Sequence, residues 1–198
     1  MSLPARWGSS LYEAGIDEAG RGCLAGPVIA AAVILPPDYA NPSIRDSKQL
    51  SATKRYAIRE EILREAWTWS IGSSSPKQID AQNILQASIS AMHEAINLLS
   101  IPPDFLVVDG NRFNHPHIPF QCLIKGDNKI LSVAAASILA KTFRDDLMTQ
   151  LDKLFPMYQW KQNKGYPTDY HRKMIQSFGV CEWHRRSFLL LQPPTLFD

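Results

Sequence analysis

The sequence predicts an α/β fold in which helices cover a mixed β-sheet. Two segments of strand length come first in the chain, residues 11–18, which enter a glycine-rich turn, and the apolar residues 27–35. Segments with the apolar spacing of helices then alternate with further short apolar runs. Leading strands followed by such an alternation are typical of a mixed sheet with helices packed on its faces.

The first half of the chain shows four elements. Residues 11–18 form a strand that enters a glycine-rich turn, and residues 27–35 form a buried strand. Ser51 is placed to cap a helix over about 52–66. The alternating pattern of residues 67–73 predicts a third strand.

The second half begins with an amphipathic helix, which the proline pair 102–103 stops. Residues 104–110 predict a short strand that ends in an Asp-Gly turn, and residues 118–127 another strand. A long helix over 129–154 follows, then a shorter helix after Pro167 and an irregular end. The apolar face of the amphipathic helix consists of Leu85, Ile89, Met92, Ile96 and Leu99.

Composition narrows the class of protein. The chain has 198 residues, 45% hydrophobic and 20% charged, which suits a single globular domain over residues 1–198. It contains no apolar run of about 18 residues, and its start lacks a signal-peptide pattern, so we expect a cytoplasmic protein without a membrane span. Cys23, Cys122 and Cys181 form no C-x-x-C pair, which argues against a disulfide framework and a zinc site.

The net charge of +2 is a weak signal for nucleic-acid binding. The distribution of charge is more informative, because basic residues concentrate beyond Lys161. An enzyme that holds metal ions with acidic residues and phosphate with basic residues would have such a near-neutral sum.

Four acidic residues stand where strands become turns or where a helix begins. They are Asp17, Glu18, Asp109 and Asp127. If the strands ending at Asp17 and Asp109 are neighbours, their carboxylates meet at one edge of the sheet. Clustered carboxylates need a compensating cation, and oxygen ligands favour Mg²⁺ or Mn²⁺.

Each acid also has a structural interpretation. Asp17 and Glu18 could form a solvated strand end, and Asp109 with Gly110 a plain turn. Asp127 could cap the long helix that follows it. The joint pattern favours two divalent ions about 3.5–4 Å apart, a common device for phosphodiester hydrolysis.

A series of motifs runs in order along nearly the whole chain. They are G-I-D-E-A-G-R-G (15–22), D-S-K-Q-L (46–50), V-V-D-G-N (107–111), K-G-D (125–127), A-A-A-S-I-L-A-K (134–141), G-Y-P-T (165–168) and H-R-R-S-F (184–188). With them the sequence closely resembles ribonuclease HII, the type 2 ribonuclease H family. The combination of D-E-A-G-R-G with D-S-K is the most specific part of this resemblance.

The resemblance implies a ribonuclease H-like fold with a five-stranded mixed sheet and a helical C-terminal part. It assigns catalysis and metal binding to Asp17, Glu18, Asp109 and Asp127, which are all intact. It assigns substrate contact to Gly20, Arg21 and Gly22, whose backbone can approach a minor groove that displays 2′-hydroxyls. Tyr166 matches the tyrosine that packs on the sugar at an RNA-to-DNA junction.

Further basic and polar residues are candidate contacts to the phosphate backbone: Lys48, Ser137, Lys141 and Arg144. Ordinary solvated helix charge is the alternative for Lys141 and Arg144, which are three residues apart. For Arg185 and Arg186, a structural tie to the sheet is an equal alternative to substrate contact. His115 and His117 are spaced like metal ligands but lie in a proline-containing loop, so we interpret them as surface.

The function implied is an endonuclease that hydrolyses the RNA strand of RNA–DNA hybrids and nicks beside single ribonucleotides embedded in duplex DNA. Two Mg²⁺ or Mn²⁺ ions would serve the reaction, and the products would carry 5′-phosphate and 3′-hydroxyl ends. Two alternatives remain open: a DNA nuclease or integrase with the same acidic cluster, and a non-catalytic module that binds hybrids.

The last residues, about 189–198, are expected to form an exposed tail, since Pro193 and Pro194 prevent a helix. Gln192 followed by Leu196-Phe197 resembles the short peptides with which bacterial repair enzymes dock on the replication sliding clamp. An inert tail, or one folded onto the domain, is the alternative. No oligomerisation signal is evident, so we expect a monomer.

Overall fold

A computed structural model describes residues 3–44 and 50–191. Its centre is a five-stranded sheet with the order β3-β2-β1-β4-β5. β2 is antiparallel to β1 and to β3, whereas β4 is parallel to β1 and to β5. The predicted mixed sheet of five strands is therefore confirmed. The strands are β1 (Glu13–Ala19), β2 (Val28–Ile34), β3 (Thr68–Ser74), β4 (Phe105–Asp109) and β5 (Phe120–Leu123).

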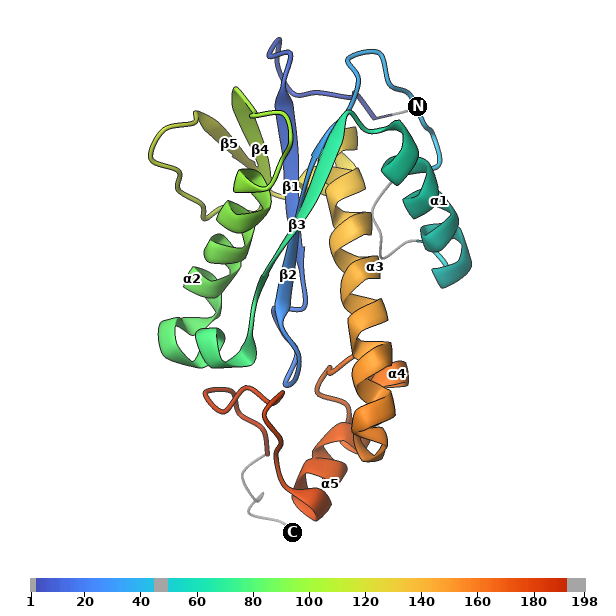
Figure 1. Cartoon of the computed structure of the whole chain (residues 1–198), viewed down its shortest axis with the longest axis vertical. Coiled ribbons are helices and arrows are strands. Elements are labelled where there is room, and N and C mark those ends of the chain that lie inside the picture. Colours follow the sequence, from blue (N-terminus) through green and yellow to red (C-terminus); the bar gives the residue numbers. More distant parts are fainter. Residues whose placement is uncertain (1–2, 45–49, 192–198) are drawn as a thin grey trace.

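Helices cover both faces of the sheet (Figure 1). On one face α2 (Pro76–Asn97) packs on β2 and β3, and on the other α3 (Leu131–Leu154) packs on β1 and β2. α1 (Ala52–Glu65) lies beside α3. Every residue of β2 is buried because its alternate side chains face different cores, Ala32 on the α2 side and Ala31 on the α3 side.

The predicted cap of the first helix is confirmed, because the Ser51 side chain accepts a hydrogen bond from the backbone N–H of Lys54. α2 consists of two helical segments joined at a kink, where Asn83 has the non-helical angles φ 69° and ψ 163°. The predicted amphipathic helix is the second segment, and at its start the Asn83 side chain accepts hydrogen bonds from the backbone N–H groups of Leu85 and Gln86. The first segment, which was not predicted, begins at Pro76, where Ser75 and Gln78 form a reciprocal capping box.

The strand predicted over 118–127 is shorter than expected, because β5 ends at Leu123. Lys125 adopts a left-handed conformation with φ 57°, and the 3-10 helix η2 (Gly126–Asn128) follows. Asp127 therefore lies on a turn ahead of α3. It does not cap α3, whose N-cap position is Ile130.

The chain beyond α3 forms a helical C-terminal part, as predicted, at the lower end of the molecule in Figure 1. It contains the 3-10 helix η3 (Pro156–Tyr158), α4 (Trp160–Asn163) and α5 (Asp169–Phe178). Its apolar side chains pack with Leu24 and Met148 in a separate core.

Several smaller predictions concern the described residues. All three cysteines are free, as expected. No described helix has the length and apolar character needed to cross a membrane. Leu189 at the start of the expected tail is exposed, but its carbonyl accepts a hydrogen bond from Arg172. Residues 192–198, which carry the candidate clamp-binding peptide, lie outside the described residues.

Candidate active site

The register of the sheet places Asp17 and Asp109 side by side. β1 and β4 are parallel neighbours in which Ile16 pairs with Val108, and each carboxylate comes one residue later. Ile16 and Val108 both belong to the core on the α2 face. Because side chains alternate along a strand, Asp17 and Asp109 leave on the opposite face, toward α3.

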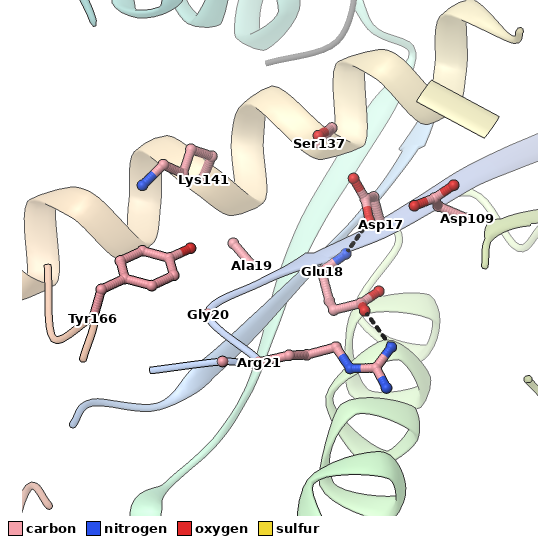
Figure 2. A pocket seen from close by; sticks show the side chains of 10 residues that line it. Asp17, Glu18, Ala19, Gly20, Arg21, Asp109, Ser137, Lys141 and Tyr166 are labelled. Atoms are coloured by element: carbon pink, nitrogen blue, oxygen red, sulfur yellow. Dashed lines mark hydrogen bonds and ion pairs between the residues drawn. The ribbon is translucent and has the colours of Figure 1, made fainter. Parts of the chain in front are cut away.

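α3 lies directly over this pair of carboxylates (Figure 2). The close approach depends on Gly15, where a β-carbon would stand 2.2 Å from the backbone carbon of Ser132. One and a half turns further along α3, Ser137 lies near the Asp17 carboxylate, whose pKa burial raises and Ser137 lowers. Ser137, predicted to contact phosphate, lines the same pocket as Asp17.

The Glu18 side chain leaves β1 on the face opposite to that of Asp17, because side chains alternate along a strand. Its Oε1 lies 3.0 Å from Nη1 of Arg21, the ion pair dashed in Figure 2. Its Oε2 is buried without a hydrogen-bond partner. Burial raises the pKa of Glu18, while Arg21 opposes the rise. An unpartnered buried carboxylate oxygen at this position fits a ligand for a cation.

Asp109 and Asp127 are linked through the turn after β5. Oδ1 of Asp109 accepts a hydrogen bond of 2.7 Å from the backbone N–H of Gly126. Asp127 is the next residue and is 5% exposed, with its Oδ1 accepting from the Asn128 side chain at 3.2 Å. It lies beside the pocket formed by the other three acids without lining it.

Electrostatics support a cation at this edge of the sheet. Burial, together with the charges of Glu18 and Asp109, raises the pKa of Asp17 well above its usual range. A divalent ion would relieve that repulsion and favour the charged form. Among the described residues, no three acidic, histidine or cysteine side chains enclose an ion by themselves. Asp17, Glu18 and Asp109 nevertheless line one pocket, in which a bound cation would offset their charge.

Three of the four acids, Asp17, Glu18 and Asp109, share one pocket of about 250 Å³ with most of the predicted substrate contacts. Tyr166 stands at its far end from Asp109 in Figure 2, with the ammonium of Lys141 5.7 Å from its ring centre. The Tyr166 hydroxyl lies near the buried Cys23 thiol; burial raises the pKa of both groups, while the thiol raises that of Tyr166 further and Tyr166 lowers that of Cys23. The residues lining the pocket are Asp17, Glu18, Ala19, Gly20, Arg21, Gly22, Asp109, Ser137, Lys141 and Tyr166.

The prediction that Arg144 contacts phosphate is wrong in this structure. Its side chain is only 1% exposed and points into the protein. The guanidinium donates to the backbone carbonyls of Ala25, Pro27 and Lys164 at 2.8–3.0 Å. Arg144 thus joins two loops and has no face left for a substrate. For Arg185, the structural alternative holds, since its side chain is fully buried.

Two residues near the pocket escaped the sequence analysis. Asp145 lies 2.6 Å from Nζ of Lys141 and fixes that ammonium beside Tyr166. The spacing of four residues on one helix could have signalled this pair. Cys23, which contacts Tyr166, carried no comparable signal. Lys48 lies outside the described residues, and the His115–His117 segment lies in a partly exposed loop, as expected.

Comparison with known proteins identifies the family and agrees with the fold. The family model for ribonuclease HII matches residues 14–191. The ribonuclease HII of Bacteroides thetaiotaomicron is 57% identical over 182 residues, which cover 91% of each chain.

Solved structures give the same result. The ribonuclease HII in the PCNA:RNase HII complex from Archaeoglobus fulgidus superposes with a TM-score of 0.73 at 28% identity. The match covers 95% of this chain and 100% of that one. The ribonuclease H2 from Pyrococcus horikoshii, at 23% identity, shares the fold with a TM-score of 0.74 over 90% of this chain and 94% of that one. This chain therefore belongs to the ribonuclease HII family, metal-dependent endonucleases that cut the RNA strand of RNA–DNA hybrids.

Proposed function

We propose that this enzyme also nicks duplex DNA beside single embedded ribonucleotides, using two divalent ions held by Asp17, Glu18, Asp109 and Asp127. The observation that supports it most directly is the shared pocket. The paired carboxylates of β1 and β4, the Gly20–Gly22 backbone and the Tyr166 ring all line it. A phosphate at the acids would therefore place its neighbouring sugars within reach of the glycines and the tyrosine.

Each protein group has a separate task in this proposal. Asp17, Glu18, Asp109 and Asp127 would together hold two Mg²⁺ or Mn²⁺ ions with their carboxylate oxygens. When bound, the ions supply an activated water and stabilise the leaving 3′ oxygen, which gives 5′-phosphate and 3′-hydroxyl ends. Lys141, fixed by Asp145, presents positive charge to the substrate backbone.

Groups at the two ends of the pocket would distinguish ribose from deoxyribose. Around Gly22 there is open space, because a β-carbon there would have no neighbour within 4 Å. The Gly20–Gly22 backbone can therefore approach a 2′-hydroxyl closely. The Tyr166 ring offers an apolar surface that suits the deoxyribose following the junction. Both features favour a ribonucleotide followed by DNA over uniform DNA, which separates this function from that of a DNA nuclease.

One cleavage experiment tests the proposal. A long hybrid, an all-DNA duplex and a DNA duplex with one ribonucleotide are each incubated with and without Mg²⁺ or Mn²⁺. The proposal requires metal-dependent cutting of the first and third substrates only. Cutting of all-DNA duplex would support the DNA nuclease alternative, and binding without cutting would support the non-catalytic module.

Tyr166→Ala is expected to lower cleavage at the single ribonucleotide more than cleavage of a long hybrid. In the hybrid, many registers are available, so other contacts compensate. Tyr170→Ala is the matched control, because both tyrosines are 40% exposed and Tyr170 lies outside the pocket. Equal losses on both substrates would show that Tyr166 does not read the junction.

A second proposal concerns the candidate clamp-binding peptide that begins at Gln192. The relative from Archaeoglobus fulgidus was solved as a complex with PCNA, a sliding clamp. A Leu196-Phe197 anchor in an apolar pocket of such a clamp would raise the effective concentration of the enzyme on DNA. Deletion of residues 192–198 should abolish binding to the clamp of the same organism and leave hybrid cleavage unchanged. A melting temperature lowered by several degrees would instead show that the tail is structural.

A further inference from the structure

A buried arginine from the C-terminal segment holds the loop that carries the glycines of the pocket. Nη2 of Arg185 donates to the carbonyl of Gly20 at 2.7 Å, Nη1 to that of Arg21 at 2.8 Å, and Nε to that of Gly26 at 2.9 Å. Its own backbone N–H donates to the carbonyl of Leu24 at 2.9 Å. One residue therefore fixes both ends and the middle of the 20–26 loop.

The environment of this guanidinium is unusual for a charged group. Arg185 is fully buried, and within the described part of the chain no carboxylate lies within ion-pair distance of it. Burial lowers its pKa to about 10, so the group stays charged at neutral pH. Its hydrogen-bond partners are backbone carbonyls, with the Asp80 charge acting from further away. A rigid fork of donors suits three such acceptors, where a lysine offers a single point.

The loop is also tied to the segment that carries Tyr166. The backbone N–H of Leu24 donates to the carbonyl of Gly165 at 2.8 Å. The Arg144 guanidinium donates hydrogen bonds to the carbonyls of both Ala25 and Lys164 and so links the two segments. Gly165 itself packs so closely that a β-carbon there would stand 2.5 Å from the carbonyl oxygen of Ala25. A shift of the loop would therefore change the spacing between the glycines and the tyrosine.

We propose that Arg185 is a positioning residue for substrate recognition, which sets the Gly20–Gly22 backbone at the distance from Tyr166 that admits a ribonucleotide. This inference rests on the proposed reading of the junction by those residues. Arg185 touches neither the carboxylates nor the solvent-facing side of the pocket. Its effect is therefore on the binding of substrate rather than on the chemical step.

The segment carrying Arg185 has an anchor of its own on the protein surface. The Asp80 carboxylate accepts from the backbone N–H groups of Arg186 and Ser187, each at 2.9 Å, and from the Ser187 hydroxyl at 2.6 Å. Asp80→Ala would loosen Arg185 from outside without opening a buried site. It offers a second, milder way to disturb the same loop.

The test is steady-state cleavage of the single-ribonucleotide duplex by Arg185→Lys, with Arg64→Lys as control. Arg64 lies on α1 away from the pocket, its side chain is 66% exposed, and the substitution is chemically the same. Arg185→Lys is expected to raise KM roughly tenfold, as small misplacements of positioning groups do, with kcat changed less than about threefold. Asp80→Ala should raise KM in the same direction by a smaller factor, and Arg64→Lys should match the wild type.

Three outcomes would overturn the inference. One is a wild-type KM in folded Arg185→Lys, even with a lowered melting temperature, since that shows a purely structural role. Another is a loss confined to kcat. If Arg185→Lys does not fold, an unchanged KM in Asp80→Ala would overturn the inference instead. Failure of the proposed function looks different, because the wild-type enzyme would then cut all-DNA duplex as readily as the ribonucleotide substrate.

Discussion

Gly15→Ala tests the contact that brings α3 over the carboxylates. A β-carbon at this position would stand 2.2 Å from the backbone carbon of Ser132 and 2.4 Å from the backbone nitrogen of Val133. Both atoms belong to the helix backbone, so no rotation of a side chain removes the overlap. Ordinary contact begins at 3.4 Å, and α3 must therefore retreat from β1 by about 1.2 Å, the difference between 3.4 and 2.2 Å.

Overpacking of a core costs about 1–3 kcal/mol, and a displaced helix backbone belongs at the upper end, about 3 kcal/mol. At about 2–4 °C per kcal/mol for a chain of this size, the melting temperature should fall by roughly 6–12 °C. The retreat would also carry Ser137 away from Asp17. Hybrid cleavage measured well below the melting temperature should therefore fall too, by about tenfold or more.

The assay is thermal and urea unfolding followed by circular dichroism, together with hybrid cleavage at a temperature where every variant is folded. Gly22→Ala is the control for stability, because a β-carbon there has no neighbour within 4 Å. Its free energy of unfolding should stay within about 0.5 kcal/mol of the wild type. If Gly15→Ala melts within 2 °C of the wild type, roughly the span of a surface change, the close-contact reasoning is refuted.

Two further predictions concern charge. Asp109→Asn should abolish hybrid cleavage yet keep the fold, because it removes a ligand charge and no core volume; it should also weaken the rise in melting temperature that Mg²⁺ or Mn²⁺ causes in the wild type. Full activity in the folded variant would refute the metal site. Burial, with His171 beside it, lowers the pKa of His184 to about 4, so on acidification the unfolded chain binds a proton first, near its ordinary pKa of 6.5. The free energy of unfolding should decline from pH 6.5 to 4 more steeply in the wild type than in His184→Gln, and parallel profiles in urea would contradict this.

The acidic part of the site was predictable because it follows from strand chemistry. Asp17 and Asp109 each end an apolar run, and the parallel pairing of β1 with β4 makes them neighbours. The glycines on either side of Arg21 likewise predicted a loop, and that loop lines the pocket. Local patterns carry such features, because strand alternation and strand ends are set by adjacent residues.

The role of Arg144 was not predictable in the same way. Lys141 and Arg144 have the same charge and lie three residues apart on one helix, so their spacing gives both the same expected exposure. What separates them is tertiary. Lys141 meets Asp145 at the pocket, whereas Arg144 meets the carbonyls of Ala25 and Pro27 inside the protein. The segment of α2 before the kink at Asn83 was not predicted because it is short and buries only Pro76 and Ile79, which gives little apolar periodicity.

The two halves of the pocket are therefore stabilised by different means. The carboxylates stand on strands and beside a helix, whose backbone groups are paired within regular structure. The 20–26 loop has no such pairing, and its buried carbonyls need donors from elsewhere. Arg144 and Arg185 supply four of these bonds, to the carbonyls of Gly20, Arg21, Ala25 and Gly26, and Arg144 adds one to Pro27 just beyond the loop. Because both arginines come from segments distant in the sequence, the shape of the 20–26 loop depends on the whole domain. If this loop reads the substrate as proposed, substitutions far from the acids should alter substrate choice before they alter catalysis.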